Sequence, residues 1–124
     1  MKNCVFCLDN NMLSDAPLFQ NKSFYVLGMR DPDRKHALMI IPKAHSETPF
    51  EMTPDEWADI AEPLAWAKDR LAAFKPDGFT IGWNVGKVAG QTVAHVHMHV
   101  ICRFADEPST GAGINKLIKR VNAA

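Results

Sequence analysis

Two apolar stretches in the first part of the chain are typical of β-strands. Residues 23–28 (SFYVLG) and 36–42 (HALMIIP) are rich in aromatic and branched side chains, and the polar residues 31–34 (DPDR) lie between them. Short runs of this kind, bounded by Pro and Asp, are typical of strands joined by a turn. We therefore predict an antiparallel hairpin.

The next part of the chain has helical spacing. Thr53-Pro54-Asp55-Glu56 combines an N-cap residue, a proline at the first helical position and an acid two residues further on. The apolar residues that follow recur every three or four positions, which places them on one side of a helix: Trp57, Ile60, Ala61, Leu64, Ala67, Leu71 and Phe74. Pro63 lacks a backbone N–H, so we expect a kink or break near residues 59–63.

Two more strands are expected at residues 79–84 and 93–103, joined by the glycine-rich residues 86–90. Strands grouped around one helix predict an α+β fold with an antiparallel sheet. The tail over residues 108–124 begins as a loop and then shows helical spacing, at Ile114, Leu117, Ile118 and Val121.

Composition narrows the class of protein. A chain of 124 residues is expected to form a single domain, residues 1–124, and 47% apolar residues are sufficient for a core. With 14 basic and 14 acidic residues, it has no overall charge to attract nucleic acid or an anionic membrane. The longest apolar run, Ala37–Ile41, is far too short to span a membrane, and residues 1–10 lack a secretory signal. We expect a cytoplasmic protein that binds neither nucleic acid nor membrane.

Three histidines alternate with apolar residues near the end of the chain. On a strand, His95, His97 and His99 share one face, and Val96 and Met98 point to the other. A solvated sheet face explains one such histidine but poorly explains three. Two chemistries fit: ligands of a catalytic metal, or a nucleophile flanked by groups that bind an anion. Spacing alone does not choose between them.

The residues just before the histidines favour the second chemistry. A neutral imidazole is a nucleophile near pH 7 when its other ring nitrogen is held as a donor, for example by a backbone carbonyl. Upstream lie glycines, amides and a hydroxyl that could surround a phosphate: Asn84, Gly86, Gly90, Gln91 and Thr92. The glycines alone are equally consistent with a hairpin turn.

The motif G-x-N-x-G-x-x-A-G-Q-T-V-x-H-x-H-x-H, from Gly82 to His99, resembles the signature of the histidine-triad (HIT) nucleotide hydrolases and transferases. Residues 36–45 (HALMIIPKAH) resemble the upstream strand of that family. The resemblance implies a HIT-like fold, with about five antiparallel strands, one long helix and a short helix. It also implies a homodimer.

The resemblance further implies roles for individual residues. His97 would attack an α-phosphorus and form a covalent nucleotidyl-histidine that water hydrolyses. A histidine at the third triad position favours hydrolysis over sugar-phosphate exchange, and the chemistry requires no catalytic metal. Supporting roles around the phosphate, the ribose and the scissile bridge fall to His36, His95, His99, Asn84, Gly90, Gln91 and Thr92.

The chain departs from the family at the ribose site. Many relatives carry an acid eight positions before the residue that matches His36, and here that position is Gly28. Asp31 is the expected replacement if the turn is rearranged. By resemblance, the nucleobase would be selected by apolar residues near Phe6, Leu27 and Met29.

Cys4 and Cys7 form a C-x-x-C pair, which is half of a tetrahedral zinc site. The resemblance implies that His45 and His95 complete a structural zinc site, as in several bacterial relatives. Free thiols are the alternative, and a thioredoxin-like redox pair is disfavoured because no βαβ unit surrounds it. Cys102 is expected to be a buried thiol.

The sequence therefore predicts a hydrolase of purine nucleotide phosphoramidates or dinucleoside polyphosphates, acting through His97. One alternative is a metal-dependent hydrolase with His95, His97 and His99 as zinc ligands. A second alternative is a nucleotide-binding module without significant turnover.

Overall fold

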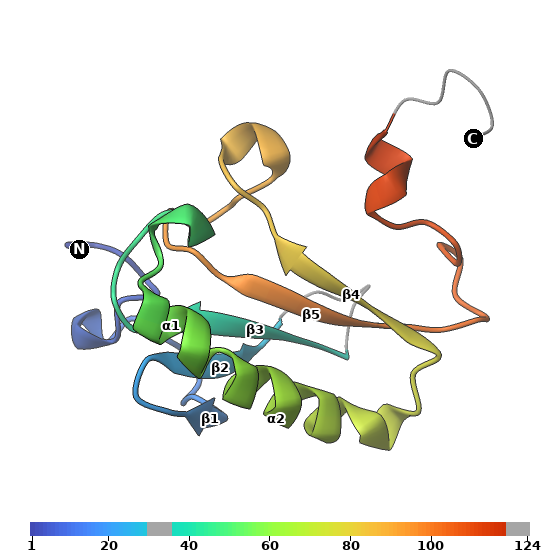
Figure 1. Cartoon of the computed structure of the whole chain (residues 1–124), viewed down its shortest axis with the longest axis horizontal. Helices are drawn as coiled ribbons and strands as arrows, with labels where there is room; N and C mark the ends of the chain where they lie inside the picture. The colour runs from blue at the N-terminus through green and yellow to red at the C-terminus, as the bar shows by residue number, and fades with distance from the viewer. Residues whose placement is uncertain (30–35, 119–124) are drawn as a thin grey trace.

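The computed structural model describes residues 1–29 and 36–118, so the predicted turn at residues 31–34 and Val121 lie outside the described residues. A five-stranded antiparallel sheet has the order β1-β2-β3-β5-β4 (Figure 1). Its strands are β1 (Phe19–Gln20), β2 (Phe24–Gly28), β3 (Ala37–Pro42), β4 (Gly78–Trp83) and β5 (Met98–Arg103). The predicted hairpin is formed by β2 and β3.

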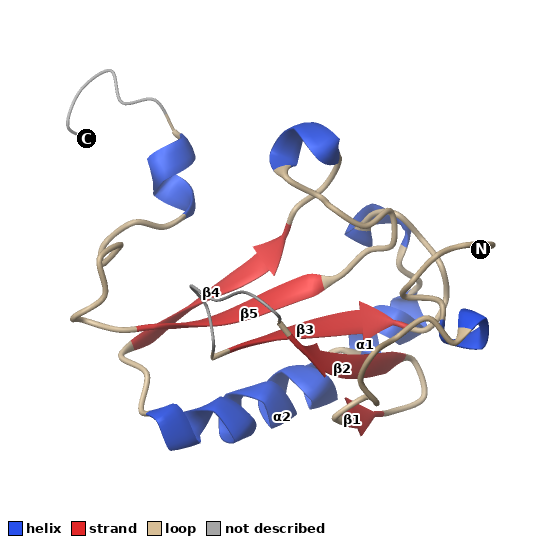
Figure 2. Ribbon diagram, turned by 180° about the vertical axis from the view of Figure 1, so that it is seen from behind, coloured by secondary structure: helices blue, strands red, loops and turns tan. Residues whose placement is uncertain are grey.

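Two α-helices, α1 (Pro54–Asp59) and α2 (Ala61–Leu71), cover one face of this sheet (Figures 1 and 2). Short 3₁₀ turns occur at Leu8–Asn10, Pro49–Glu51, Ala72–Phe74, Lys87–Ala89 and Ile114–Leu117. The predicted α+β fold is confirmed. In the tail, the apolar spacing corresponds to the last of these short turns, whose residues Ile114 and Leu117 are exposed.

The helix begins and breaks where the sequence predicts. The Thr53 hydroxyl accepts a hydrogen bond from the Glu56 N–H at 3.2 Å, and Glu56 accepts one from the Thr53 N–H at 2.8 Å. The break falls at Ile60, between α1 and α2. Pro63 has no N–H to offer the Asp59 carbonyl, and the side-chain amide of Asn21 donates to this carbonyl instead, at 3.0 Å.

The two faces of the sheet carry different layers. On the helix side, an apolar core forms from alternate strand residues and the helices, including Val26, Ile40, Val100 and Leu71. On the other side, the N-terminal segment packs over a second cluster made of Phe6, Tyr25, Leu27 and Ile41. The buried Tyr25 hydroxyl donates to the Phe6 carbonyl at 2.6 Å, which fixes this segment to β2.

The last strand is shorter than predicted. It begins at Met98 rather than at Val93, because the preceding residues bond to the loop after β3 instead of to a neighbouring strand. The Val96 N–H donates to the Ser46 carbonyl at 2.7 Å. Val96, Met98 and Val100 are nevertheless all buried, so the predicted alternation continues through residues that lie outside the strand.

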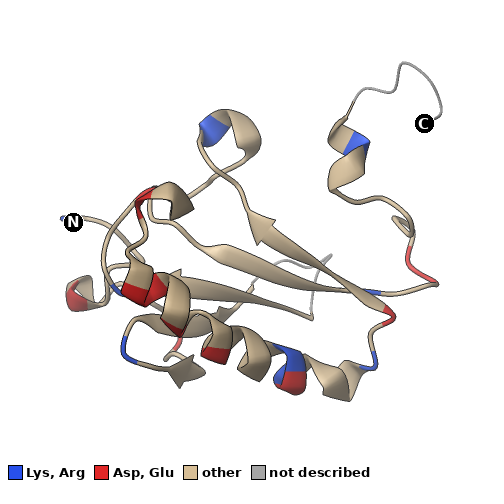
Figure 3. Ribbon diagram, in the orientation of Figure 1, with Lys and Arg blue, Asp and Glu red and all other residues tan. Residues whose placement is uncertain are grey.

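The described helices do not present a continuous basic face. Acidic side chains gather on α1 and at the start of α2, whereas Lys and Arg are scattered over the described elements (Figure 3). Among the described residues, none of the helices is both long and apolar enough to cross a membrane.

Candidate active site and metal cluster

His97 is held in one orientation by the backbone. Its Nδ1 lies 2.8 Å from the carbonyl oxygen of His95, and because a carbonyl only accepts, Nδ1 carries the proton and donates. Nε2 then keeps its lone pair, and no described residue is hydrogen-bonded to it. Burial lowers the pKa of His97, and the hydrogen bond to His95 opposes this shift only in part. The side chain is therefore a neutral imidazole at pH 7, which is the nucleophilic form.

His99 lies beside His97 and lacks partners. The two rings are 4.9 Å apart between centroids. Both ring nitrogens of His99 are buried, and neither has a hydrogen-bond partner among the described residues. Burial, and then the proximity of His97, lower its pKa. A buried polar group without a partner is costly, so His99 is ready to bond a polar ligand next to His97.

His36 does not join these two histidines. Cross-strand neighbours share a face of a sheet, and His99 pairs with Met39 of β3. His36 is an odd number of positions from Met39, and its ring stacks on Phe74 at 3.8 Å, beyond the end of α2. The expectation that His36 orients the phosphate is therefore wrong for this structure, because a shift of one residue along a strand reverses the face.

Gly28 also lies one residue out of register with the histidine face of the sheet. It pairs with Leu38, which is buried on the helix side, so a side chain at position 28 would point away from the histidines. Met29, whose N–H donates to the Ala37 carbonyl at 3.1 Å, is the next residue along. Neither position 28 nor position 29 therefore carries an acid. Asp31 lies outside the described residues.

Residues 86–91, predicted to surround a phosphate, form a loop that is held by hydrogen bonds of the Gln91 side chain. Gly86 and Gly90 have positive φ angles of 86° and 98°, which favour glycine. The Gln91 side chain is buried, and its amide is used by the backbone: it accepts from the Gly86 N–H at 2.7 Å and donates to the carbonyls of Glu47 and Val93. Gln91 therefore holds the loop rather than offering its amide to a ligand, contrary to expectation.

Asn84 and Thr92 remain open to a ligand. Asn84 follows Trp83, which pairs with Met98, so it leaves β4 beside His97. Its side chain is exposed and lies next to Gly90. Thr92 is exposed in the wall of a separate cavity that also includes Cys4 and His45.

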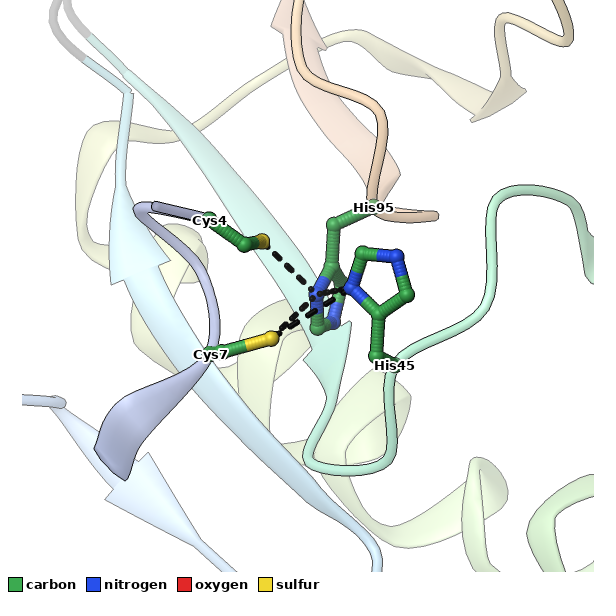
Figure 4. Close-up of side chains that lie close together, drawn as sticks. All are labelled: Cys4, Cys7, His45 and His95. Atoms are coloured by element: carbon green, nitrogen blue, oxygen red, sulfur yellow. Dashed lines mark hydrogen bonds between the residues drawn. The ribbon is translucent and has the colours of Figure 1, made fainter. Parts of the chain in front are cut away.

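Cys4, Cys7, His45 and His95 form a compact cluster (Figure 4). Their ligand atoms all lie within 4.8 Å of one another. His95 Nδ1 is 3.4 Å from Cys4 Sγ and 3.2 Å from His45 Nδ1, and Cys7 Sγ is 3.3 Å from His45 Nδ1. Tetrahedral zinc, with its usual bonds to sulfur and nitrogen, places ligand atoms about 3.3 to 3.8 Å apart. The cluster therefore has dimensions that fit zinc.

The tautomer of His95 also fits a metal. Its Nε2 donates to the Pro42 carbonyl at 2.7 Å, which leaves the lone pair on Nδ1, facing the cysteines. A ligating histidine commonly donates its other nitrogen to a backbone carbonyl in this way. The sequence offers no signal for this contact, since any residue can supply the carbonyl of position 42.

His95 links this cluster to the active site. Its side chain faces Cys4 and Cys7, and its carbonyl holds His97. The three triad histidines therefore do not converge on one point. Phe6 contacts both His95 and His97, with ring centroids 6.0 and 5.1 Å away.

An α+β fold with a five-stranded antiparallel sheet, and the three alternating histidines His95, His97 and His99 that lead into β5, place the chain in the class of histidine-triad proteins. The chain belongs to the HIT family: the HIT domain model matches residues 12–106. One relative is an adenosine 5′-monophosphoramidase of Schizosaccharomyces pombe, which is 30% identical over 115 residues, covering 90% of this chain and 82% of that protein.

Solved structures share the fold. A HIT family protein from Bacillus subtilis has a TM-score of 0.80 and 25% identity, and the match covers 98% of this chain and 84% of that chain. A zinc-bound histidine triad family protein from Mycobacterium smegmatis has a TM-score of 0.72 and 26% identity, over 86% of this chain and 78% of that chain.

Proposed function

We propose that this protein hydrolyses nucleotides at the α-phosphate through a covalent nucleotidyl intermediate on His97. The observation that carries the proposal is the hydrogen bond from His97 Nδ1 to the His95 carbonyl, which leaves the Nε2 lone pair available. The two unpartnered nitrogens of His99 supply a site for a phosphate oxygen next to that lone pair.

The reaction has two displacements. First, His97 Nε2 forms a bond to the α-phosphorus, and the P–N or P–O bond to the leaving group breaks. The leaving group departs with the electron pair and takes up a proton from solvent. The imidazole becomes cationic, and the His95 carbonyl stabilises it through Nδ1. Second, water attacks the phosphorus and releases a proton to solvent, the P–Nε2 bond breaks with its electron pair returning to Nε2, and the nucleoside monophosphate leaves with neutral His97 restored.

Purine nucleotide phosphoramidates are the first substrate class to test, and dinucleoside polyphosphates are the second. The adenosine 5′-monophosphoramidases of S. pombe and Saccharomyces cerevisiae support the first class, at 30% and 35% identity. Asn84 and Thr92 are the exposed polar side chains proposed to contact the substrate, beside the backbone of Gly90.

We also propose a structural zinc at Cys4, Cys7, His45 and His95, supported by the ligand spacing and by the zinc-bound relative. Bound zinc would supply a cross-link between the N-terminal segment, the loop after β3 and the segment before β5. A catalytic zinc on all three triad histidines is disfavoured, because His95 Nε2 donates to the Pro42 carbonyl and its remaining lone pair, on Nδ1, faces the cysteines rather than His97 and His99.

A homodimer is proposed through β4 and α2. β4 is an outer strand of the sheet, and its Ile81 is 43% exposed. Beside it lies an apolar hollow of about 400 Å³ lined by Leu64, Ala65 and Phe79. An open strand edge next to apolar side chains is a surface on which a second copy can pack symmetrically.

The direct test compares the wild type with His97→Ala on adenosine phosphoramidate and a diadenosine polyphosphate. We expect the wild type to release AMP and the variant to lose about 10⁴-fold or more in turnover. Intact-mass analysis of a rapidly quenched reaction should detect a nucleotidyl adduct on the wild type alone.

Stability and binding controls make this comparison decisive. His97 is buried, so the melting temperature of the variant and its affinity for AMP are measured on the same samples. Substantial AMP release by a folded His97→Ala protein would contradict the mechanism. AMP binding without turnover by the wild type would favour the binding-module alternative.

A further inference from the structure

Cys4 and Cys7 lie on one tight turn, close enough to bond to each other (Figure 4). The Cys7 N–H donates to the Cys4 carbonyl at 3.4 Å, which closes a turn of four residues, and such a turn brings its end Cα atoms to within about 7 Å. The two Sγ atoms lie within 4.8 Å of each other. A disulfide needs Cα atoms about 4.4 to 6.8 Å apart. The turn therefore holds the two thiols where a disulfide can form with little backbone movement.

A cavity makes this cysteine pair accessible. It has a volume of about 430 Å³, and Cys4 and His45 line it together with residues of the segment before β5. The side chain of Cys4 is half-buried, whereas Cys7 is buried. A small reagent can therefore reach Cys4 Sγ from this cavity without passing between His97 and His99, neither of which lines it.

Hydrogen bonds hold the segments of the cluster in place independently of a metal. The Tyr25 hydroxyl donates to the Phe6 carbonyl, inside the cysteine turn, at 2.6 Å. The Val96 N–H donates to the Ser46 carbonyl at 2.7 Å, and this bond joins the two residues that directly follow the histidines of the cluster. The four side chains therefore stay near one another when a metal leaves and remain placed to bind one again.

We propose that Cys4 and Cys7 are a site of reversible oxidation, at which a peroxide closes a disulfide between them and the cluster releases its metal. This redox site is distinct from the hydrolysis proposed for His97 and rests on the zinc proposed for the cluster. A cysteine binds zinc as a thiolate, which is also the form that reacts with peroxide. A disulfide offers no thiolate, so only two of the four ligands remain after oxidation, and tetrahedral zinc is no longer held.

The oxidation takes place in two steps. First, Cys4 Sγ attacks one oxygen of the peroxide, the O–O bond breaks, Cys4 becomes a sulfenic acid, and the departing oxygen takes up a proton from solvent. Second, Cys7 Sγ attacks Cys4 Sγ, the S–O bond breaks, and the departing hydroxide takes up a second proton. With hydrogen peroxide, the two sulfur atoms give up two electrons and two water molecules form. A dithiol reductant restores both thiols by thiol–disulfide exchange.

Cys102 is the internal reference for this pair. It is buried in the core on the helix side of the sheet, whereas Cys4 packs against the apolar cluster of the opposite face. The sheet therefore separates Cys102 from the pair, so oxidation at the cluster should leave the Cys102 thiol reduced.

The test treats the zinc-loaded protein with a small excess of hydrogen peroxide. A chromogenic chelator should report the release of about one zinc per chain. After alkylation under denaturing conditions, peptide mapping should find Cys4 and Cys7 joined by a disulfide and Cys102 alkylated. The melting temperature should fall to that of the chelated wild type. Dithiothreitol followed by zinc should reverse all three changes.

Cys102→Ala is the matched control and should release zinc as the wild type does. Cys7→Ala lacks the partner of the second step, so no disulfide should form within the chain, whether or not this variant holds zinc. Zinc that stays bound after Cys4 and Cys7 are oxidised, zinc that leaves while both can still be alkylated, or a disulfide that includes Cys102 would each overturn the proposal. A wild type that holds no zinc before treatment would overturn it as well.

Discussion

At the residue scale, the structure separates two histidines that the sequence makes look alike. His99 is adjacent to His97 and has two buried nitrogens without partners among the described residues. His36 stacks on Phe74 on the helix side. Chemical identity therefore does not assign a role: the face of the strand decides which imidazole can reach a phosphate.

His36→Ala tests this separation. Loss of the stack with Phe74 should lower the free energy of unfolding by about 1 to 2 kcal/mol. The kcat/KM for adenosine phosphoramidate should stay within about twofold of the wild type, measured below the melting transition. His99→Ala is the comparison and should lose at least about a hundredfold, because it removes a phosphate partner. A similar loss of kcat/KM in His36→Ala would contradict the placement of His36 outside the active site.

At the element scale, the ends of the helices depend on residues that are neighbours in the sequence, whereas the start of the last strand depends on a contact with a distant segment. Thr53 and Glu56 begin the helix by bonding each other, so the start could be predicted from four residues. The break before Pro63 could also be predicted locally, because proline has no backbone N–H for the helical hydrogen bond. The start of β5 was not, because it depends on the Val96 N–H bonding Ser46, which is 50 residues away in the chain.

The outer strand β4 gives the element-scale prediction. Ile81→Lys places a charge on the apolar surface proposed to pair two copies, and a buried unpaired charge is unfavourable at such an interface. We expect a dimer for the wild type and a monomer for Ile81→Lys by light scattering coupled to gel filtration. The exposed Val88 offers a control, since Val88→Lys should remain dimeric. A monomeric wild type would contradict the proposed pairing.

At the scale of the whole molecule, the cysteine and histidine cluster joins segments that are far apart in sequence. Cys4 and Cys7 lie in the N-terminal segment, His45 follows β3, and His95 precedes β5. A metal bound here stabilises the folded chain, because the unfolded chain does not hold the four ligands together.

Removal of the metal should therefore act on stability. One zinc per chain is expected by metal analysis, and a chelator should lower the melting temperature by about 10 °C, as for a ligand present at a hundredfold excess over its dissociation constant. Cys7→Ala should melt near the chelated wild type and respond little to chelator. Cys102→Ala should still bind zinc, because Cys102 is a residue of β5 whose side chain is buried in the core on the helix side of the sheet. Wild-type protein without stoichiometric metal would contradict the zinc proposal.

The sequence by itself determined the helix cap, the break before Pro63 and the burial of Val96, Met98 and Val100, because each depends on neighbours within a few residues. Through the resemblance, it also pointed to the four residues that the structure brings together as the metal cluster. Only the tertiary structure decided the rest.

Strand register turned His36 and Gly28 away from the active site, since one residue along a strand exchanges the two faces. The side-chain amide of Gln91 is hydrogen-bonded to the backbone of Gly86 and Glu47, so it is not available to a ligand. The pairing of β1 with β2 placed Asp15 in the wall of an apolar cavity that Phe6 and Leu27 also line. These features depend on contacts between distant segments, which the order of residues along the chain does not display.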